Sequence, residues 1–334
     1  LYLNDGSGGF EVASTDVFPD LRSNTGALAA ADYDGDGDLD LYVVSGGVEG
    51  DDDSDHYQDR LYLSVENGLS VAPEGALPDM NFSGSCVAVG DFDRDSDLDL
   101  FVGARVIPGN YPKSVPSRLL INVTPGPNGQ VCFVDAPSEV ASTLADAGMV
   151  TDALWSDADS DGDLDLLVTT EYGPVKFYRN DGGKLIDATA TAGLAERLGW
   201  WTCIASADVD ADGDPDYAIG NFGWNTKYHP TKERPQLLFY GDFTGLGKSH
   251  CVEAHLAGNK LVPNRGRSCS SRAMPFIAER FENYHAFAIA ELADIYSAAK
   301  LQSVIKLEAN QLSTGILLND GRGNFDFRPL AQLA

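Results

Sequence analysis

Short apolar runs alternate with tight polar turns along the chain, and this pattern predicts β-hairpins. Four runs of small or apolar residues, GALAAA, SCVAVG, DALWS and TCIASA, each lead into an acidic turn. A run rich in β-branched and aromatic residues follows each turn: LDLYVVS, LDLFVGA, LDLLVTT and PDYAIGN. Strand, tight turn and strand in this order indicate a hairpin. The small residues of the first strand suit a crowded position near a central axis.

A second kind of hairpin recurs between the acidic ones. It comprises LYLNDGSGGFEV from Leu1, RLYLSVENGLSV from Arg60, KFYRNDGGKLID from Lys176 and ILLNDGRGNFDF from Ile316. Asn-Asp-Gly or Asn-Gly between alternating apolar residues is a good hairpin signal, because the turn needs residues that tolerate positive φ. One acidic hairpin and one hairpin of the second kind together make a unit of four strands.

The acidic turns are four nonapeptides that align when their aspartates are superposed. They are DYDGDGDLD at 32–40, DFDRDSDLD at 91–99, DADSDGDLD at 157–165 and DVDADGDPD at 208–216, and they hold 20 of the 51 acidic residues. Asp stands at positions 1, 3, 5, 7 and 9 of each. The aligned residues are Asp32, Asp34, Asp36, Asp38, Asp40, Asp91, Asp93, Asp95, Asp97, Asp99, Asp157, Asp159, Asp161, Asp163, Asp165, Asp208, Asp210, Asp212, Asp214 and Asp216.

These aspartates are candidate calcium ligands. Five carboxylates within nine residues repel one another unless a hard cation binds them, and Ca²⁺ takes six to eight oxygens at roughly 2.3 to 2.6 Å. Alternate positions suit a loop that curls round an ion. By analogy with such loops, positions 1, 3, 5 and 9 offer side-chain oxygens and position 7 offers its main-chain carbonyl. The position 7 side chains, expected to face water, are those of Asp38, Asp97, Asp163 and Asp214.

The sixth position of the loops supports a sharp turn. It is Gly37, Gly162 and Gly213 in three loops and Ser96 in the second, and a residue without Cβ is favoured where the chain bends tightly. Pro215 replaces Leu in the fourth loop, which fits the entry to a strand. No loop is followed by a helix with Glu at position 12, so these are not EF-hands.

The loops begin at residues 32, 91, 157 and 208, at spacings of 59, 66 and 51 residues. A four-stranded repeat of about this period favours a β-propeller. With its DxDxDGDxD loops the chain resembles the FG-GAP or VCBS repeat proteins and the integrin α-subunit propellers. The resemblance implies an all-β propeller of four-stranded blades, commonly seven in the family, with about five blades' worth in residues 1–334. It also implies calcium in the turn between the first two strands of a blade.

A fifth, degenerate loop is expected at Asp242. The stretch GDFTGLGKSHCVEA aligns with the other loops but keeps only the first ligand, so no calcium is expected there. It starts only 34 residues after the fourth loop. Either the fourth blade is abbreviated or this segment is an outer hairpin.

From about Ala273 the pattern changes to apolar residues at three- and four-residue steps, which predicts two or three helices at about 273–310. A helical insertion preceded by RGRSCSS is similar to bacterial members of the family. A cap that packs on the propeller is the expected role.

Neither end of the chain completes a blade in the expected pattern. Leu1 and Ile316 each open an outer hairpin, whereas a propeller usually closes by combining strands from both termini. We therefore expect a section of a longer protein, or completion by another chain. The first residues show no signal peptide.

Five cysteines without CxxC spacing argue against a disulfide scaffold or a zinc site. Buried free thiols are expected, and a bridge between Cys251 and Cys269 is the alternative.

Net charge narrows the range of partners. The formal charge is −28 and the pI is about 4.2, which argues against nucleic acid and anionic membrane surfaces. Four calcium ions would bring the formal charge to −20. The acidity therefore indicates metal loops and a calcium-rich compartment, extracellular or at the cell surface, with the periplasm as another option. No apolar run is long enough to cross a bilayer.

Three functions fit these features. The first is an adhesion, interaction or assembly module that meets a protein, a glycan or another copy of itself. The second is a lectin, because aromatic and polar residues gather in one region: Trp200, Trp201, Trp224, Asn225, Lys227, Tyr228, His229, Arg265 and Arg267. The third is a polysaccharide-active enzyme, although the histidines are scattered and no catalytic motif appears, so no catalytic residue is assigned.

Overall fold

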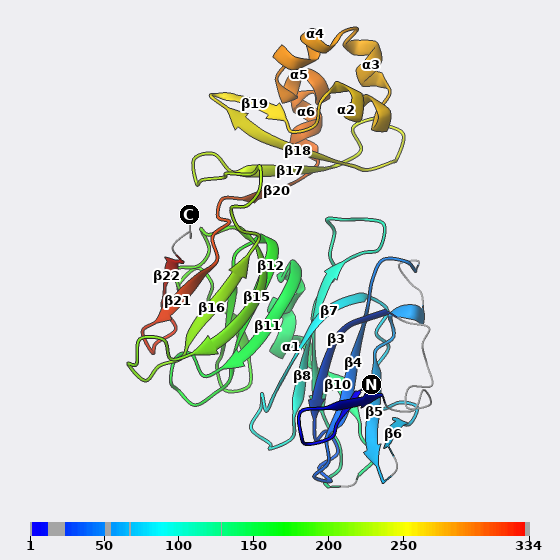
Figure 1. Ribbon diagram of the computed structural model, residues 1–334, viewed down its shortest axis with the longest axis vertical. Helices are drawn as coiled ribbons and strands as arrows, with labels where there is room; N and C mark the ends of the chain where they lie inside the picture. Colours follow the sequence, from blue (N-terminus) through cyan, green and yellow to red (C-terminus); the bar gives the residue numbers. More distant parts are fainter. Residues whose placement is uncertain (1, 13–23, 51–54, 67, 128, 331–334) are drawn as a thin grey trace.

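The computed structural model describes residues 2–12, 24–50, 55–66, 68–127 and 129–330. Within them the protein is mostly β, with antiparallel sheets arranged like the blades of a propeller (Figure 1). This confirms the predicted all-β, propeller-like fold. Leu1, from which the first outer hairpin was counted, lies outside the described residues.

Four units of four strands each, which we call blades, stand side by side. Blade 1 has β3 (Asn24–Ala31), β4 (Asp40–Gly46), β5 (Arg60–Val65) and β6 (Gly68–Val71). Blade 2 has β7 (Ser83–Gly90), β8 (Asp99–Val106), β9 (Arg118–Asn122) and β10 (Phe133–Asp135). Blade 3 has β11 (Met149–Ser156), β12 (Asp165–Gly173), β13 (Lys176–Asn180) and β14 (Leu185–Asp187). Blade 4 has β15 (Gly199–Ala207), β16 (Asp216–Asn221), β21 (Gly315–Asn319) and β22 (Phe325–Pro329).

Shorter elements surround the blades. β1 (Tyr2–Asn4) and β2 (Phe10–Val12) form a two-stranded sheet of their own. The 3-10 turn η2 (Asp55–Tyr57) precedes β5, and α1 (Ser138–Ala141) with η3 (Ser142–Asp146) precedes β11. Blades 3 and 4 are joined into one sheet because β12 pairs with β15 at Glu171 and Trp200.

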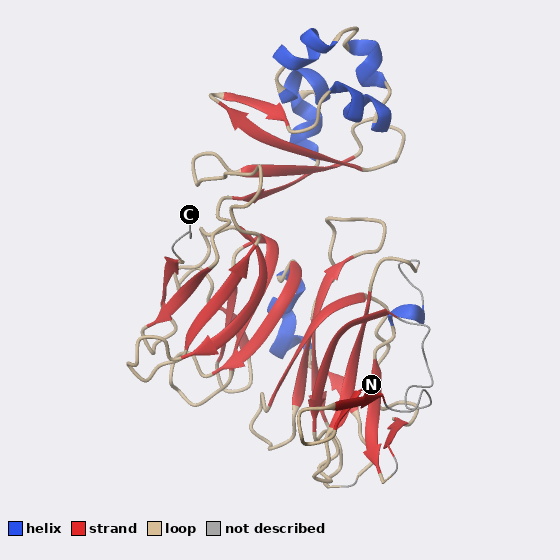
Figure 2. Cartoon of the chain, viewed as in Figure 1, coloured by secondary structure: helices blue, strands red, loops and turns tan. Residues whose placement is uncertain are grey.

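A large insertion divides blade 4 between its second and third strands. A separate sheet of order β19-β18-β17-β20 forms from β17 (Gln236–Gly241), β18 (His250–Ala257), β19 (Lys260–Pro263) and β20 (Ile305–Ala309). Five short helices follow β19: α2 (Arg267–Ala273), α3 (Phe276–Arg280), α4 (Tyr284–Ile289), α5 (Leu292–Tyr296) and α6 (Ala298–Ser303). Figure 2 shows the helices gathered in this insertion, apart from the short ones near the blades.

The insertion corrects two expectations. There are five short helices over 267–303 rather than two or three over 273–310, because Pro275, Asn283 and Ser297 each begin a new segment. The loop at Asp242 joins β17 to β18 in the inserted sheet. It therefore belongs neither to an abbreviated fourth blade nor to an outer hairpin.

Each innermost strand carries a bulge at an equivalent place. Register shifts leave four residues unpaired, Gly26, Ser85, Thr151 and Thr202. The Ser85 Oγ donates to the main-chain oxygen of Val150 in blade 3 over 2.8 Å, and the Thr151 Oγ1 donates to that of Trp201 in blade 4 over 2.9 Å. The bulges therefore place hydroxyl groups between neighbouring blades.

The core lies mainly between the blades. Phe92 and Trp155 pack between blades 2 and 3 with ring centroids 5.7 Å apart, and the Trp155 Nε1 donates to the main-chain oxygen of Ala88. Trp201 is 1% exposed and packs against Phe327 between blades 3 and 4. A separate apolar cluster holds the inserted helices on β17 and β18.

The cysteines are less buried than expected. All five are free thiols, which leaves Cys251 and Cys269 unbridged. Cys86 is buried, Cys132 is half-buried, and the other three are exposed. The exposed thiols lie on the bulged strand β15, on β18 and in α2, where one side of each element faces solvent.

Candidate metal centres

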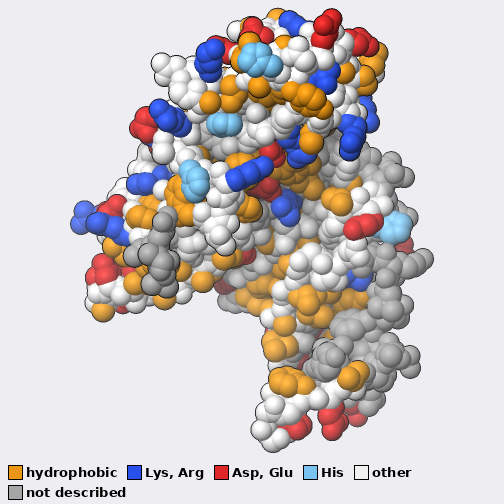
Figure 3. Space-filling view, turned by 45° about the horizontal axis from the view of Figure 1, so that its top comes forward, with side chains coloured by type: hydrophobic (Ala, Val, Ile, Leu, Met, Phe, Trp, Pro, Cys, Tyr) orange, Lys and Arg blue, Asp and Glu red, His pale blue; other side chains and the backbone are white. Residues whose placement is uncertain are grey.

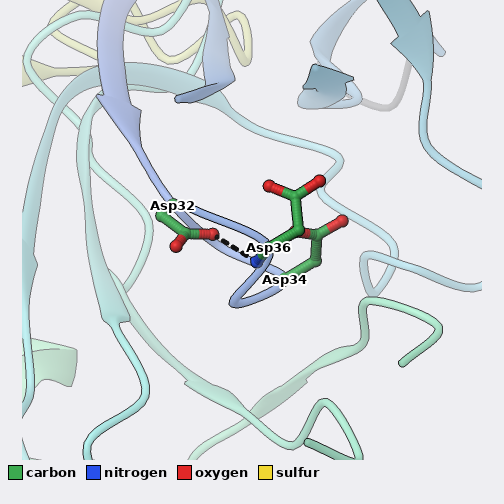
Figure 4. Close-up of side chains that lie close together, drawn as sticks. All are labelled: Asp32, Asp34 and Asp36. Carbon is green, nitrogen blue, oxygen red and sulfur yellow. Dashed lines mark hydrogen bonds between the residues drawn. The ribbon is translucent and has the colours of Figure 1, made fainter. Parts of the chain in front are cut away.

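The acidic nonapeptides form the turns between the first two strands of the four blades. In each, the position 1 carboxylate accepts a hydrogen bond from the position 6 amide, as between Asp32 and Gly37 at 2.9 Å. The position 7 amide donates to the position 5 carboxylate, as from Asp38 to Asp36 at 2.9 Å. Figure 4 shows the first loop, where Asp34 and Asp36 lie side by side and Asp32 accepts from the Asp36 amide.

The loops curl because two of their residues adopt left-handed backbone. At position 6, Gly37, Gly162 and Gly213 have φ between 88° and 100°, and Ser96 has φ 79°. The sequence predicted this turn. It did not predict the same conformation at position 4, where Arg94, Ser160 and Ala211 have φ of 60° to 63°. Side chains at such angles are strained, so the surrounding loop must hold them in place.

The position 9 aspartates are candidate metal ligands, and they also hold the loops in place by hydrogen bonds. Asp40, Asp99, Asp165 and Asp216 are at most 1% exposed. In Asp99, Oδ2 accepts from the Phe92 amide within the loop and Oδ1 accepts from the Asn122 amide on β9. The other three make the same pair of bonds. Each buried carboxylate therefore ties the loop to the third strand of its blade.

The carboxylates gather closely enough to share one ion. Four groups have ligand oxygens within 4.8 Å of one another: Asp32, Asp34 and Asp36; Asp91, Asp93 and Asp99; Asp157, Asp159 and Asp161; Asp208, Asp210 and Asp216. Two oxygens that bind one Ca²⁺ at about 2.4 Å are at most about 4.8 Å apart. The spacing therefore fits calcium.

Unpartnered oxygens support the same fit. Asp91, Asp157 and Asp159 each have a buried Oδ1 that finds no hydrogen-bond partner among the described residues. A buried carboxylate oxygen is costly to leave without a donor or a cation. The loops thus contain oxygen atoms that protein groups do not satisfy, in the places where calcium ligands are expected.

Electrostatics in the loops favours a cation. Burial raises the pKa of Asp34, Asp93 and Asp159, and neighbouring carboxylates of the same loop raise it further. Burial also raises the pKa of Asp99 and Asp165 to about 7. These shifts reflect burial first and crowding of negative charge second, and a bound divalent cation would offset both.

The position 7 side chains differ from expectation in three loops. Asp38 is exposed, but Asp97, Asp163 and Asp214 are half-buried. Asp163 pairs with Arg94 of the preceding loop at 2.6 Å and is 14% exposed. A position 7 side chain therefore does not always face water, because the loop of the preceding blade can lie against it.

The Asp242 loop has the backbone hydrogen bonds of an acidic loop but lacks the carboxylates at positions 3, 5, 7 and 9. Asp242 accepts from the amides of Thr244, Gly245 and Gly247, much as Asp32 does in the first loop. These hydrogen bonds hold its pKa well below the usual range, with the Thr244 hydroxyl contributing most. Main-chain amides and the Thr244 hydroxyl therefore satisfy this carboxylate.

The residues proposed for a ligand site do not form one site. Trp201 is core, although it also borders the cavity of about 310 Å³ that Trp200 and Tyr228 line. Trp224 lines another cavity and donates from Nε1 to the Ser313 hydroxyl. Asn225 is exposed, and Lys227 and His229 line a third cavity.

The two arginines of the proposed cluster lie elsewhere. Arg265 lines a cavity between β18 and α2 with Cys251 and Cys269. Arg267 donates to the main-chain oxygens of Phe281, Ala278 and Glu282. Its guanidinium therefore holds the inserted helices together.

The aromatic cavity around Trp200 includes residues that sequence reasoning missed. The rings of Tyr172, Phe222 and Tyr228 surround Trp200 edge to face, with centroids 5.0 to 5.2 Å away. Glu171 accepts from the Arg105 guanidinium at 2.8 Å and from the Tyr111 hydroxyl at 2.5 Å. We call the cavity lined by Arg105, Glu171, Tyr172, Trp200, Phe222 and Tyr228 the aromatic cavity.

Comparison with known proteins agrees with the fold and the loops. The sequence model of the FG-GAP-like repeat matches residues 1–43 and 157–219, which include the first, third and fourth acidic loops. This confirms the resemblance to FG-GAP repeat proteins, whose members are typically interaction modules rather than enzymes. No curated protein matches the chain.

Proposed function

We propose that this protein is a calcium-stabilised β-propeller of the FG-GAP type that works outside the cytoplasm as an adhesion, interaction or assembly module. The observation that carries the proposal is the repeated convergence of three carboxylates in each of four loops. When bound, calcium would neutralise this charge and close each loop. Asp at positions 1, 3, 5 and 9 and the carbonyl at position 7 would hold it.

Calcium in these loops would stabilise contacts between neighbouring blades rather than one turn. The Asn122 Nδ2 donates to the main-chain oxygen of Tyr33, the second residue of the first loop, over 3.0 Å. Equivalent bonds reach the second and third loops. A loop fixed by an ion therefore fixes an acceptor for the neighbouring blade.

A calcium titration tests the proposal. The chain is stripped with a chelator, and calcium is then added while heat release, metal content and melting temperature are followed. We expect about four ions per chain and a higher melting temperature, since ligand at 100 times Kd stabilises the folded state by about 2.7 kcal/mol. An unchanged melting temperature with no bound calcium would rule the proposal out.

The location and partners of the module are part of the same proposal. Calcium loops of extracellular modules bind at roughly 10⁻⁴ to 10⁻³ M, a concentration range available outside cells. Among the described residues, no helix is long and apolar enough to span a membrane. We infer that the partner is a surface protein, a glycan or another copy of the chain.

Carbohydrate binding is a second candidate function, favoured by the aromatic cavity. A sugar ring has apolar faces that pack on aromatic side chains, and its hydroxyls both donate and accept. The aromatic cavity offers the rings around Trp200, the Glu171 carboxylate as acceptor and the Arg105 guanidinium as donor. Since Glu171 is already paired with Arg105, a neutral polyhydroxyl ligand suits it better than a cation.

A glycan array followed by calorimetry tests this second function. We expect Trp200→Ala to abolish binding of any sugar identified on the array. Tyr284→Ala, which removes an exposed aromatic side chain from the insertion, is the matched control and should bind normally. A calcium-loaded protein that binds no sugar, or a Trp200→Ala variant that binds as well as the parent, would exclude this function.

A further inference from the structure

Basic residues are concentrated in the insertion. Residues 222–314 contain 11 Lys and Arg against 8 Asp and Glu, whereas the remaining chain contains 12 against 43. Four of the five histidines also lie there. Figure 3 shows Lys, Arg and His side chains over the upper part of the molecule and Asp and Glu at the lowest tip. A net positive segment therefore stands on a strongly negative protein.

Several of these basic groups line one cavity. Lys227, His229, Arg234 and His255 border a cavity of about 320 Å³, which we call the basic cavity. They come from the segment between β16 and β17 and from β18. Within the described residues, no Asp or Glu lines this cavity. Convergence of four basic side chains without a carboxylate is unusual in a chain of net charge −28.

Neighbouring groups orient the basic side chains. The His229 ring stacks on Trp224, with centroids 5.9 Å apart and planes 5° from parallel. The Lys227 Nζ lies 5.1 Å from the centroid of the Tyr228 ring. These contacts place an amine and an imidazole beside the cavity, and within the part of the chain that the structure describes neither has a carboxylate partner.

A turn and a polar contact position the other two groups. Main-chain bonds between Thr231 and Arg234, each 3.1 Å, close the turn that presents Arg234. The His255 Nδ1 lies 2.6 Å from the Asn264 Oδ1. With the amide oxygen as acceptor, Nδ1 carries the proton and Nε2 is left for another partner.

Two carboxylates adjacent in sequence to this region are engaged elsewhere. Glu233 accepts from the Thr231 hydroxyl at 3.0 Å, and Glu253 accepts from the Tyr228 hydroxyl at 3.2 Å. Neither lines the basic cavity. The charges of Lys227 and Arg234 are therefore available to a ligand.

We propose that the basic cavity binds one oxyanion group, a carboxylate, sulfate or phosphate. Arginine and lysine form charge-assisted hydrogen bonds with such groups, and a histidine that carries a proton adds another donor. A single group fits better than a polyanion, because the surrounding negative protein repels an extended nucleic acid or an anionic membrane. The group arrives either as a free ion or on a larger molecule such as an acidic sugar.

Calorimetry on the calcium-loaded full chain tests the site. Sodium phosphate, sulfate and acetate are titrated at fixed ionic strength, with chloride as the reference. We expect saturable binding of at least one oxyanion, and a decrease in affinity of at least about tenfold in the Lys227→Gln, Arg234→Gln double variant. Titration of glucuronate, with glucose as its uncharged counterpart, distinguishes a free ion from an anion carried on a sugar. Tighter binding of glucuronate than of acetate indicates an anion carried on a sugar.

A matched control separates a site from general charge. Lys248→Gln removes an exposed basic side chain of the insertion that does not line the basic cavity, and it should bind within about twofold of the parent. Melting temperatures verify that the variants are folded. The proposal is overturned if the oxyanions give no more heat than chloride, or if Lys248→Gln weakens binding as much as the double variant. Neither result would bear on calcium binding by the loops.

Discussion

Asn180, the last residue of β13 in blade 3, donates from Nδ2 to the main-chain oxygen of Phe92 in the acidic loop of blade 2, over 3.0 Å. Asn122 reaches Tyr33 in the same way, and Asn319 reaches Ala158 over 2.8 Å. All three asparagines are at most 5% exposed. In blades 2, 3 and 4, a side chain at the end of the third strand thus joins its blade to the loop of the preceding one.

Replacement of Asn180 by Ala should loosen blades 2 and 3. The variant leaves a buried carbonyl at Phe92 without its donor, so we expect a loss of about 1 to 3 kcal/mol in the free energy of unfolding. Chemical denaturation in saturating calcium measures it. Asn4 ends β1 at an equivalent position but is exposed, and Asn4→Ala should cost less than about 0.5 kcal/mol. Equal losses in both variants would argue against the inter-blade role.

The bulge hydroxyls provide a second comparison. Thr151→Val keeps the shape of the side chain but removes its bond to the Trp201 carbonyl, so it should destabilise the protein by about 1 to 2 kcal/mol. Thr202 occupies the equivalent bulge, and its hydroxyl contacts only the Cys203 sulfur at 3.8 Å among the described residues. Thr202→Val should therefore leave the melting temperature unchanged, and a loss equal to that of Thr151→Val would contradict the interpretation.

Loss of one loop ligand should remove one ion. Asp159→Asn takes away a carboxylate whose Oδ1 is buried and unpartnered, so the bound calcium should decrease by about one ion per chain. Metal analysis after gel filtration measures it. Asp242→Asn is the control, because the amides around Asp242 satisfy it and the loop lacks further carboxylates. If Asp242→Asn also lost an ion, the degenerate loop would have to be a metal site.

Stability should depend on pH through Asp59, which lies outside the acidic loops. Asp59 is 4% exposed and accepts from the Tyr42 hydroxyl and the Ser45 amide, each at 2.7 Å. Burial nevertheless raises its pKa to about 7. The folded state keeps this proton between roughly pH 4 and 7, where the unfolded chain has released it. The contribution of Asp59 to stability is therefore present at low pH and lost as the pH rises through about 7.

Asp59→Asn should flatten that dependence. In saturating calcium, the change in unfolding free energy between pH 5 and pH 8 should shrink by on the order of 2 kcal/mol relative to the parent. Asp326→Asn, which removes an exposed carboxylate paired with Arg328, should leave the pH profile as it is. A parent protein with no decrease in stability across this range would contradict the raised pKa.

The sequence predicted those features that depend on local repetition. Aspartates at alternate positions with Gly37 or its equivalents define the loop and its register, because both ligand spacing and backbone conformation are local properties. The Asn-Gly turns define the outer hairpins for the same reason. The outer hairpin of blade 2 was missed because its turn, between Asn122 and Phe133, is long.

Features that depend on the meeting of distant segments could not be predicted. Arg105, Glu171 and Trp200 come from three blades, and no spacing in the chain relates them. In the sequence, Asn180 looks like any asparagine that begins a hairpin turn. Its role as a hydrogen-bond donor to the neighbouring blade is visible only in the fold. Arg267 is a candidate ligand residue by sequence because it is basic. In the fold its guanidinium instead donates to main-chain carbonyls.

The insertion leaves and rejoins blade 4 between two strands that are already bonded to each other. β16 pairs directly with β21, with Tyr217 opposite Leu317 and Ile219 opposite Gly315. The blade therefore does not need residues 222–314 to bring its second and third strands together. Other domains can be inserted at this junction in place of residues 222–314, because an inserted domain needs only two ends as close together as those of a hairpin turn. A propeller built this way can exchange the inserted unit and keep its four-stranded blades.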